Sequence, residues 1–210
     1  MLKRTKILIA SLFVTLFVAS APVLAYEGFS GGDSSQDGCY TCTKYAQEVF
    51  NAKGYSTYYY YGFTNEDVAS KVPLVRTFFS YGHGDNTGSV GRFGVNTLRM
   101  QTTNGIIDSD QMYNLTKGYY KFVFIHGCHS GETSAWFHAF NMCEGDAGNH
   151  ATLGYKGTID TGATYQNFAK VTLYYLKGGH TVSGSVWNAY LETGVNSTKY
   201  QIYGNYDATL

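Results

Sequence analysis

The sequence predicts an α/β fold, a three-layer sandwich around a mostly parallel sheet of about six strands. Strand-like and helix-like segments alternate along the chain, and two strand-like segments, 74–81 and 119–125, are rich in apolar and aromatic residues. Strands separated by helices are joined by crossover connections, which make them parallel and cover both faces of the sheet. With 210 residues and 44% hydrophobic content, the chain is long enough to bury one such core.

Residues 1–25 are expected to be a secretory signal peptide rather than part of the fold. Three basic residues near the N-terminus precede the apolar run 7–19, and cleavage is expected after Ala25. An uncleaved membrane anchor is the alternative, but this apolar run is shorter than the ~20 residues that span a bilayer. The mature chain 26–210 is therefore expected to be secreted, with no membrane contact after cleavage.

Composition excludes two classes of protein and suggests how the mature chain is divided. Aromatic residues make up 17% of the chain, so it has enough apolar surface to avoid disorder. No basic run follows residue 6, which excludes a strongly basic nucleic-acid binder. The glycine- and serine-rich stretch predicts a polar leader over 26–38, followed by a single domain over 39–210. The oligomeric state stays open.

Helix and strand patterns alternate in the first half of this domain. Apolar residues at helical spacing predict a helix over 42–53. The tyrosine-rich run 56–61 is typical of a strand. Thr64 is a suitable N-cap for a short helix that Pro73 ends, and the apolar run 74–81 then predicts a buried strand.

The second half continues the alternation after a hairpin. The dipeptide Asn104-Gly105 is a strong turn signal and predicts that 90–107 is a hairpin excursion. The segment 119–125 is the most strand-like in the chain. Helical spacing and short β-rich runs predict the remaining elements, which are helices over 133–143, 163–177 and 182–192 and strands over 151–155 and 200–203.

Two loops carry the residue types of nucleophilic catalysis. Strand 74–81 runs into Gly82-His83-Gly84, and strand 119–125 runs into His126-Gly127-Cys128. Binding and catalysis collect at the carboxyl ends of parallel strands, and neighbouring strands would bring His83 and Cys128 together. A thiol beside a base is an activated nucleophile, and glycines let backbone N–H groups approach a substrate carbonyl.

This pair of motifs resembles the caspase-like cysteine peptidases, a group that includes caspases, legumains, clostripain, gingipains and CHAT domains. The resemblance rests on a strand ending in His-Gly and a second ending in Gly-Cys, with Ser130-Gly131 after it, and covers about residues 56–204. It implies that His83 is the catalytic histidine and Cys128 the nucleophile. The backbone N–H groups of Gly84 and Cys128 would then form the oxyanion hole.

The N-terminal part departs from this group. The group's first strand precedes the first helix, whereas 26–41 is short, polar and glycine-rich here, so the sheet has only a stub at 26–29 or lacks one central strand. Members that cleave after basic residues carry an acidic residue in the first specificity pocket. Asp160 is the best candidate for that role, with Asp146 second. The alternative for Asp160 is a cap for a helix that begins near Thr161.

The expected function is a secreted cysteine endopeptidase that acts on proteins or peptides through an acyl-enzyme, without a metal or cofactor. A zinc site is disfavoured because its candidate ligands, His83, His126, His129 and Cys128, include adjacent residues of poor geometry. One alternative is a catalytically inactive caspase-fold binding module. Another is a thiol–disulfide protein that uses the Cys39/Cys42 pair, although a local disulfide or two free thiols is the favoured interpretation of that pair. Cys143 is expected in the core.

Overall fold

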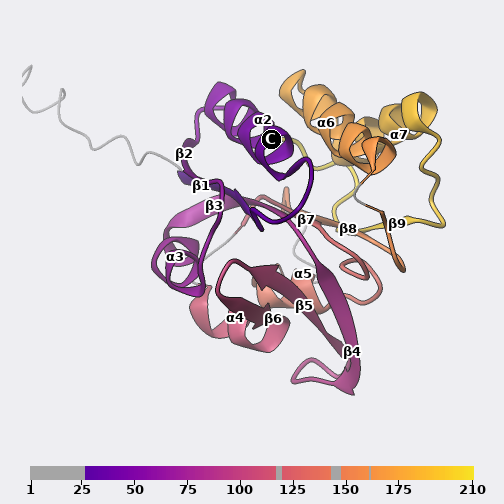
Figure 1. The fold of residues 1–210 in the computed structure, drawn as a ribbon. Coiled ribbons are helices and arrows are strands. Elements are labelled where there is room, and N and C mark those ends of the chain that lie inside the picture. The colour runs from indigo at the N-terminus through magenta and orange to yellow at the C-terminus, as the bar shows by residue number, and fades with distance from the viewer. Residues whose placement is uncertain (1–26, 117–119, 143–147, 161) are drawn as a thin grey trace, which may run out of the picture.

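A six-stranded sheet organises the computed structural model, which describes residues 27–116, 120–142, 148–160 and 162–210 (Figure 1). The strand order is β2-β1-β3-β7-β8-β9, and only the edge strand β9 runs antiparallel to its neighbour. The elements of this sheet and the helices between its strands are β1 (Glu27–Gly32), α2 (Cys39–Ala52), β2 (Ser56–Tyr60), α3 (Asn65–Lys71), the 3-10 turn η1 (Val72–Leu74), β3 (Val75–Tyr81), β7 (Phe122–His126), α5 (Ala135–Ala139), β8 (Ala151–Tyr155), α6 (Ala163–Lys177), α7 (Val182–Thr193) and β9 (Tyr200–Gly204). The predicted α/β fold is confirmed.

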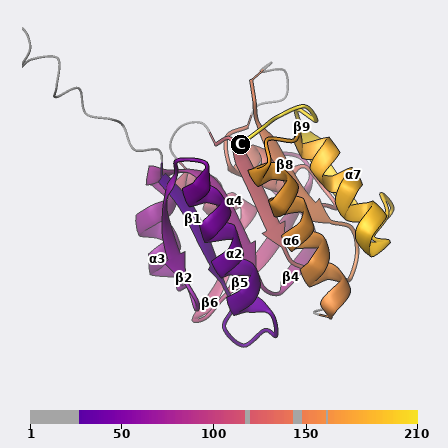
Figure 2. The same ribbon diagram turned by 90° about the horizontal axis from the view of Figure 1, so that it is seen from above.

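Three layers result from this order. Helices α2, α6 and α7 cover one face of the sheet, and α3 and α5 lie on the other (Figures 1 and 2). Successive residues of β3 and β7 point to opposite faces, so Phe79 and Phe124 enter the core beneath α2 and α6, whereas Phe78 and Val123 enter the other core. Because both faces are covered, apolar residues predominate at successive positions of these strands, as expected of parallel strands.

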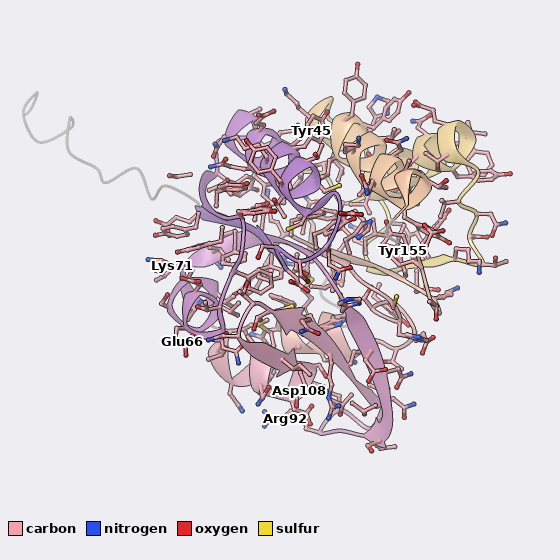
Figure 3. All side chains as sticks on the ribbon, in the orientation of Figure 1. Tyr45, Glu66, Lys71, Arg92, Asp108 and Tyr155 are labelled. Carbon is pink, nitrogen blue, oxygen red and sulfur yellow. The ribbon has the colours of Figure 1, made fainter. Side chains whose placement is uncertain are left out.

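The core on the α6 side is built from stacked aromatic rings. Tyr155, labelled in Figure 3, is fully buried between the sheet and α6. Its ring lies 5.9 Å from that of Phe124 on β7 and 5.8 Å from that of Phe168 on α6, measured between ring centroids. These contacts hold α6 against the sheet and fix the position of the loop between β8 and α6.

The prediction for the N-terminal segment is wrong. Residues 27–32, assigned there to a polar leader, form β1, which is buried between β2 and β3 rather than a stub or a missing strand. Its glycines are required by close packing: a Cβ atom on Gly28 would lie 2.8 Å from the hydroxyl oxygens of Thr57 and Thr77, and one on Gly32 would lie 2.4 Å from Cys39 Sγ. Close approach of neighbouring elements, not flexibility, explains this composition.

A small antiparallel sheet extends from the carboxyl edge of β3. It consists of β4 (Gly84–Val90), β5 (Asn96–Thr102) and β6 (Gly105–Asp108), and α4 (Ser109–Leu115) follows it. A tight turn is present near the predicted position but one residue earlier: Thr103-Asn104 joins β5 to β6, and Gly105 already pairs with Thr102 as the first residue of β6. Neither β4 nor α4 was predicted, since β4 is largely exposed and polar and has no apolar pattern.

The predicted signal peptide, residues 1–25, lies outside the described residues, as do Cys143 and Asp146. Within the four described ranges, no helix is both long and apolar enough to cross a membrane.

Candidate active site

The strands β3 and β7 bring the two candidate loops side by side. They are parallel neighbours, with Tyr81 paired to His126 at their ends. Gly82 N–H then donates to the carbonyl oxygen of His126 over 3.0 Å, which continues the pairing one residue further. Since His83 and Cys128 each lie two residues beyond the paired positions, the register places them at equivalent points on adjacent loops.

Glycine permits these two loops to touch. A Cβ atom on Gly84 would lie 2.3 Å from the carbonyl oxygen of Cys128 and 3.2 Å from its nitrogen. A Cβ atom on Gly127 would lie 2.9 Å from the carbonyl oxygen of Gly82 and 3.2 Å from the nitrogen of Gly84. The backbone segments at Gly84 and Cys128, which are expected to form an oxyanion hole, are therefore in direct contact, and no side chain fits between them.

The His83 side chain is exposed and is held from the loop that follows β1. Its Nε2 atom lies 2.7 Å from Nε2 of Gln36. Its carbonyl oxygen accepts a hydrogen bond of 2.9 Å from Gln101 N–H on β5. A cavity of about 80 Å³ adjoins His83 and Gly84 on the side of the small sheet, and Arg99 lines it. The site is thus open to solvent at His83.

The Cys128 side chain is half-buried and faces the loop after β8. Its Sγ atom lies 3.3 Å from the carbonyl oxygen of Ile159 and 3.4 Å from its nitrogen, so that the thiol both donates to and accepts from one residue. No hydrogen bond joins the thiol to the His83 ring among the described residues. Catalytic hydrogen bonds are often formed only when substrate is bound, so this arrangement is compatible with a dyad.

The Cys128 N–H is available as a donor. Among the described residues it donates to no backbone or side-chain acceptor, whereas the next N–H, that of His129, donates to the carbonyl oxygen of Gly157 over 2.8 Å. An unpaired N–H beside the candidate nucleophile is what stabilisation of an oxyanion requires.

Glu132 ties the turn after Cys128 to strand β4 and to the loop after β8. Its carboxylate is 2.5 Å from His129 Nδ1 and accepts hydrogen bonds from Asn86 on β4 and from the N–H of Gly157 after β8. Burial opposes ionisation, but these bonds outweigh it and hold the pKa of Glu132 below its ordinary value. His129 has a φ of 59°, in the left-handed region, which a residue other than glycine adopts at some backbone cost. Sequence analysis missed Glu132, because its partners are 46 and 25 residues away.

His126 belongs to the core rather than to the site. Its side chain is buried, its ring stacks on Tyr81 with centroids 4.3 Å apart, and its Nε2 atom lies 3.2 Å from the carbonyl oxygen of Tyr165. Burial lowers the pKa of His126 to about 4, so its ring is neutral at physiological pH. In the described part of the chain, no cluster of three His, Cys, Asp or Glu side chains is suited to hold a metal ion.

Asp160 lies exposed in the loop between β8 and α6. Its Oδ1 atom accepts a hydrogen bond of 2.9 Å from Gly162 N–H, and Gly162 itself is the N-cap of α6, which has no side-chain cap. Burial, and then the charges of Asp160 and Cys128, raise the pKa of Tyr165. Cys128 and Tyr165 both pack against the core beneath α2 and α6, and Asp160 lies in the loop that leads into α6.

The Cys39/Cys42 pair is buried at the start of α2. Both side chains are 0% exposed, and both thiols are free. The Cys39 thiol faces the carbonyl oxygen of Tyr61 at 3.4 Å, and the Cys42 thiol faces that of Gln166 at 3.9 Å. Burial raises the pKa of each thiol to about 12, which opposes the thiolate that disulfide exchange requires.

Comparisons with known proteins place this site in no family. No protein-family profile matches the sequence, and no match is found among curated proteins. Among solved structures, the chain is similar to the crystal structure of protein GSU0716 from Geobacter sulfurreducens, a structural genomics target. That match has a TM-score of 0.47 and 14% sequence identity, and it covers 84% of this chain and 92% of that chain.

Proposed function

We propose that this chain is a secreted cysteine endopeptidase of the caspase-like class, with Cys128 as nucleophile and His83 as general acid and base. The observation that carries the proposal is the contact between the loops after β3 and β7, where a backbone glycine, Gly84, meets Cys128. The presence of β1 before the first helix adds support, because the sequence had predicted that this strand was short or missing, which was the main departure from this class of peptidase.

The proposed reaction begins when the Cys128 side chain turns from Ile159 toward His83. The sulfur attacks the scissile carbonyl carbon as the thiol proton passes to the His83 ring, and the N–H groups of Gly84 and Cys128 bind the resulting oxyanion. His83 then gives the proton to the leaving amine as the C–N bond breaks, which leaves a thioester. Water hydrolyses the thioester with His83 as base, and the thiol is regenerated.

The separate partners of His83 and Cys128 favour one other function, that of a catalytically inactive binding module with the same fold. The thiol–disulfide alternative is not proposed, because burial keeps Cys39 and Cys42 protonated. The proposed secretion predicts a mature protein that starts at residue 26, which the intact mass of exported material would show.

The test of the proposal is the site of reaction with a limiting thiol electrophile at pH 7.5. We expect Cys128 to react at least ~100-fold faster than Cys39 or Cys42, because it is half-exposed whereas their thiols are buried and protonated. Peptide mapping by mass spectrometry identifies the labelled residue, and peptide hydrolysis is measured in parallel. A Cys39→Ala/Cys42→Ala variant is the control and should retain both labelling and hydrolysis.

Either of two results would reject the proposal. Preferential labelling of the Cys39/Cys42 pair would restore the redox alternative. An unreactive Cys128 in a folded protein that hydrolyses no peptide of a diverse library would favour the inactive binding module.

We also propose that Asp160 gives the enzyme a preference for a basic residue immediately before the scissile bond. Since Asp160 is exposed, solvent screens its charge, and Asp160→Ala should lower kcat/KM for Arg and Lys substrates about tenfold. Substrates with Asn or Gly at that position should change less than about twofold. Asp207→Ala, which removes an exposed carboxylate on the C-terminal segment, is the control. Equal losses for all substrates would assign Asp160 a structural role in its loop.

A further inference from the structure

The loop after β1 carries a chain of hydrogen bonds that ends on His83. Asp33 lies just beyond β1, its side chain is 4% exposed, and its N–H donates to the carbonyl oxygen of Tyr81 over 2.7 Å. This bond anchors the loop to the end of β3, directly before His83. The mechanism proposed above does not use this loop.

The side chains of the loop form three successive contacts. Ser35 Oγ donates to Asp33 Oδ1 over 2.8 Å. Gln36 Nε2 donates to Ser35 Oγ over 3.3 Å, and the same nitrogen lies 2.7 Å from His83 Nε2. Asp33 Oδ1 also accepts from the N–H of Ser35, which holds the carboxylate in place.

The Asp33 carboxylate determines the direction of every bond in this chain. An ionised carboxylate only accepts, so Ser35 must use its single hydroxyl proton toward Asp33. Ser35 Oγ can then only accept from Gln36, which turns the NH₂ end of that amide, rather than its oxygen, toward both Ser35 and His83. His83 Nε2 must then accept a hydrogen bond from the second N–H of the amide through its lone pair. The single proton of the neutral ring is therefore on Nδ1.

We propose that Gln36 is a positioning residue that sets the tautomer of His83, and that Asp33 and Ser35 set the orientation of the Gln36 amide. The effect of this tautomer on catalysis rests on the proposed function. Because Nε2 faces Gln36, Nδ1 is the nitrogen left for Cys128 and substrate. With the amide in the described orientation, Nδ1 carries the ring proton and cannot accept the proton of the thiol.

The proton balance of the dyad therefore requires the Gln36 amide to turn. With its oxygen toward His83, the amide accepts from Nε2–H, and the exposed ring loses its Nδ1 proton to water as it takes one at Nε2. Nδ1 is then free to accept the proton of the Cys128 thiol. When the amide turns, the hydrogen bond from Gln36 to Ser35 is lost, whereas the two hydrogen bonds from Ser35 to Asp33 are kept. The loop after β1 thus acts as a gate on the catalytic pair.

The test is ¹⁵N NMR of histidine-labelled secreted protein at about pH 8, where an ordinary imidazole is neutral. His83 is assigned by the signals that His83→Gln removes. We expect the wild-type ring to carry its proton on Nδ1, and Gln36→Glu, an acceptor only, to move it to Nε2. Gln36→Leu and Ser35→Ala should each give a mixture of tautomers. Gln101→Leu, on the other side of His83, should match the wild type.

A wild-type ring protonated mainly on Nε2, or one that Gln36→Leu leaves unchanged, would overturn the inference. These signals do not depend on catalysis, so they report on Gln36 even if the chain proves inactive as a peptidase. If it hydrolyses peptides, Gln36→Glu should exceed Gln36→Leu in kcat about tenfold with KM unchanged. Equal kcat values would reject the gate.

Discussion

Cys128→Ala and His83→Ala are each expected to lower kcat/KM for peptide hydrolysis by at least ~10³-fold, because each removes a group that takes part in every step of the proposed reaction. Neither should change the free energy of unfolding by more than ~1–2 kcal/mol. His83 is exposed, and Cys128 is half-buried, with a thiol that bonds to no described residue other than Ile159. Residues in such strand-end loops contribute little to packing.

The measurements for this prediction are kinetics on a peptide library and urea unfolding of both variants. His129→Ala is the matched control, since His129 follows the proposed nucleophile in the sequence but its ring pairs with Glu132. It should lose less than ~10-fold in kcat/KM. Wild-type turnover in either principal variant would show that the dyad is wrong, and an unfolded variant would assign that side chain a structural role.

Gly84→Ala is expected to lower kcat by ~10²-fold or more while leaving the chain folded. The new methyl carbon would lie 2.3 Å from the carbonyl oxygen of Cys128, so the two loops must separate. Both proposed oxyanion donors belong to these loops, and the loss of one such donor costs ~10²–10³-fold in known hydrolases. Forcing atoms into a packed contact also destabilises the fold by ~1–3 kcal/mol.

The comparison for Gly84→Ala is Gly178→Ala, at the C-terminus of α6. A methyl group there would lie no closer than 3.3 Å to another atom, and the φ of Gly178 is −70°, which alanine adopts readily. This variant should keep wild-type kcat and stability within ~1 kcal/mol. A Gly84→Ala variant whose kcat matches that of Gly178→Ala would mean that the contact between the loops has no catalytic role.

Local sequence patterns determined most of the main sheet. The run 74–81 predicted β3, the run 119–125 predicted β7 within three residues, and Thr64 predicted the N-cap of α3, which the structure confirms with a capping box. These elements are set by neighbouring residues. A high density of apolar and aromatic residues marks a strand covered on both faces, and a hydroxyl side chain satisfies free N–H groups at a helix start. The placement of His83 and Cys128 on neighbouring loops followed from the same reasoning.

Other elements have no such local signal. β1 is rich in glycine because α2 and both flanking strands approach it closely, and this approach exists only in the folded chain. β4 is polar because it is exposed and pairs only with β5. For both strands the composition reflects the tertiary surroundings. Local sequence patterns therefore predicted a polar leader in place of β1 and no strand in place of β4.

By itself, then, the sequence determined the sheet type, the two strand ends and the residues of the candidate dyad. Only the tertiary structure decided which partners those residues have: Ile159 for the Cys128 thiol, 31 residues away, and Gln36 for His83, 47 residues away. It also decided that Cys39 and Cys42 are buried and that Glu132 joins the turn after Cys128 to β4 and to the loop after β8. The physical reason is range, because propensity and periodicity act over a few residues, whereas hydrogen bonding and burial at the site depend on segments that only the folded sheet brings together.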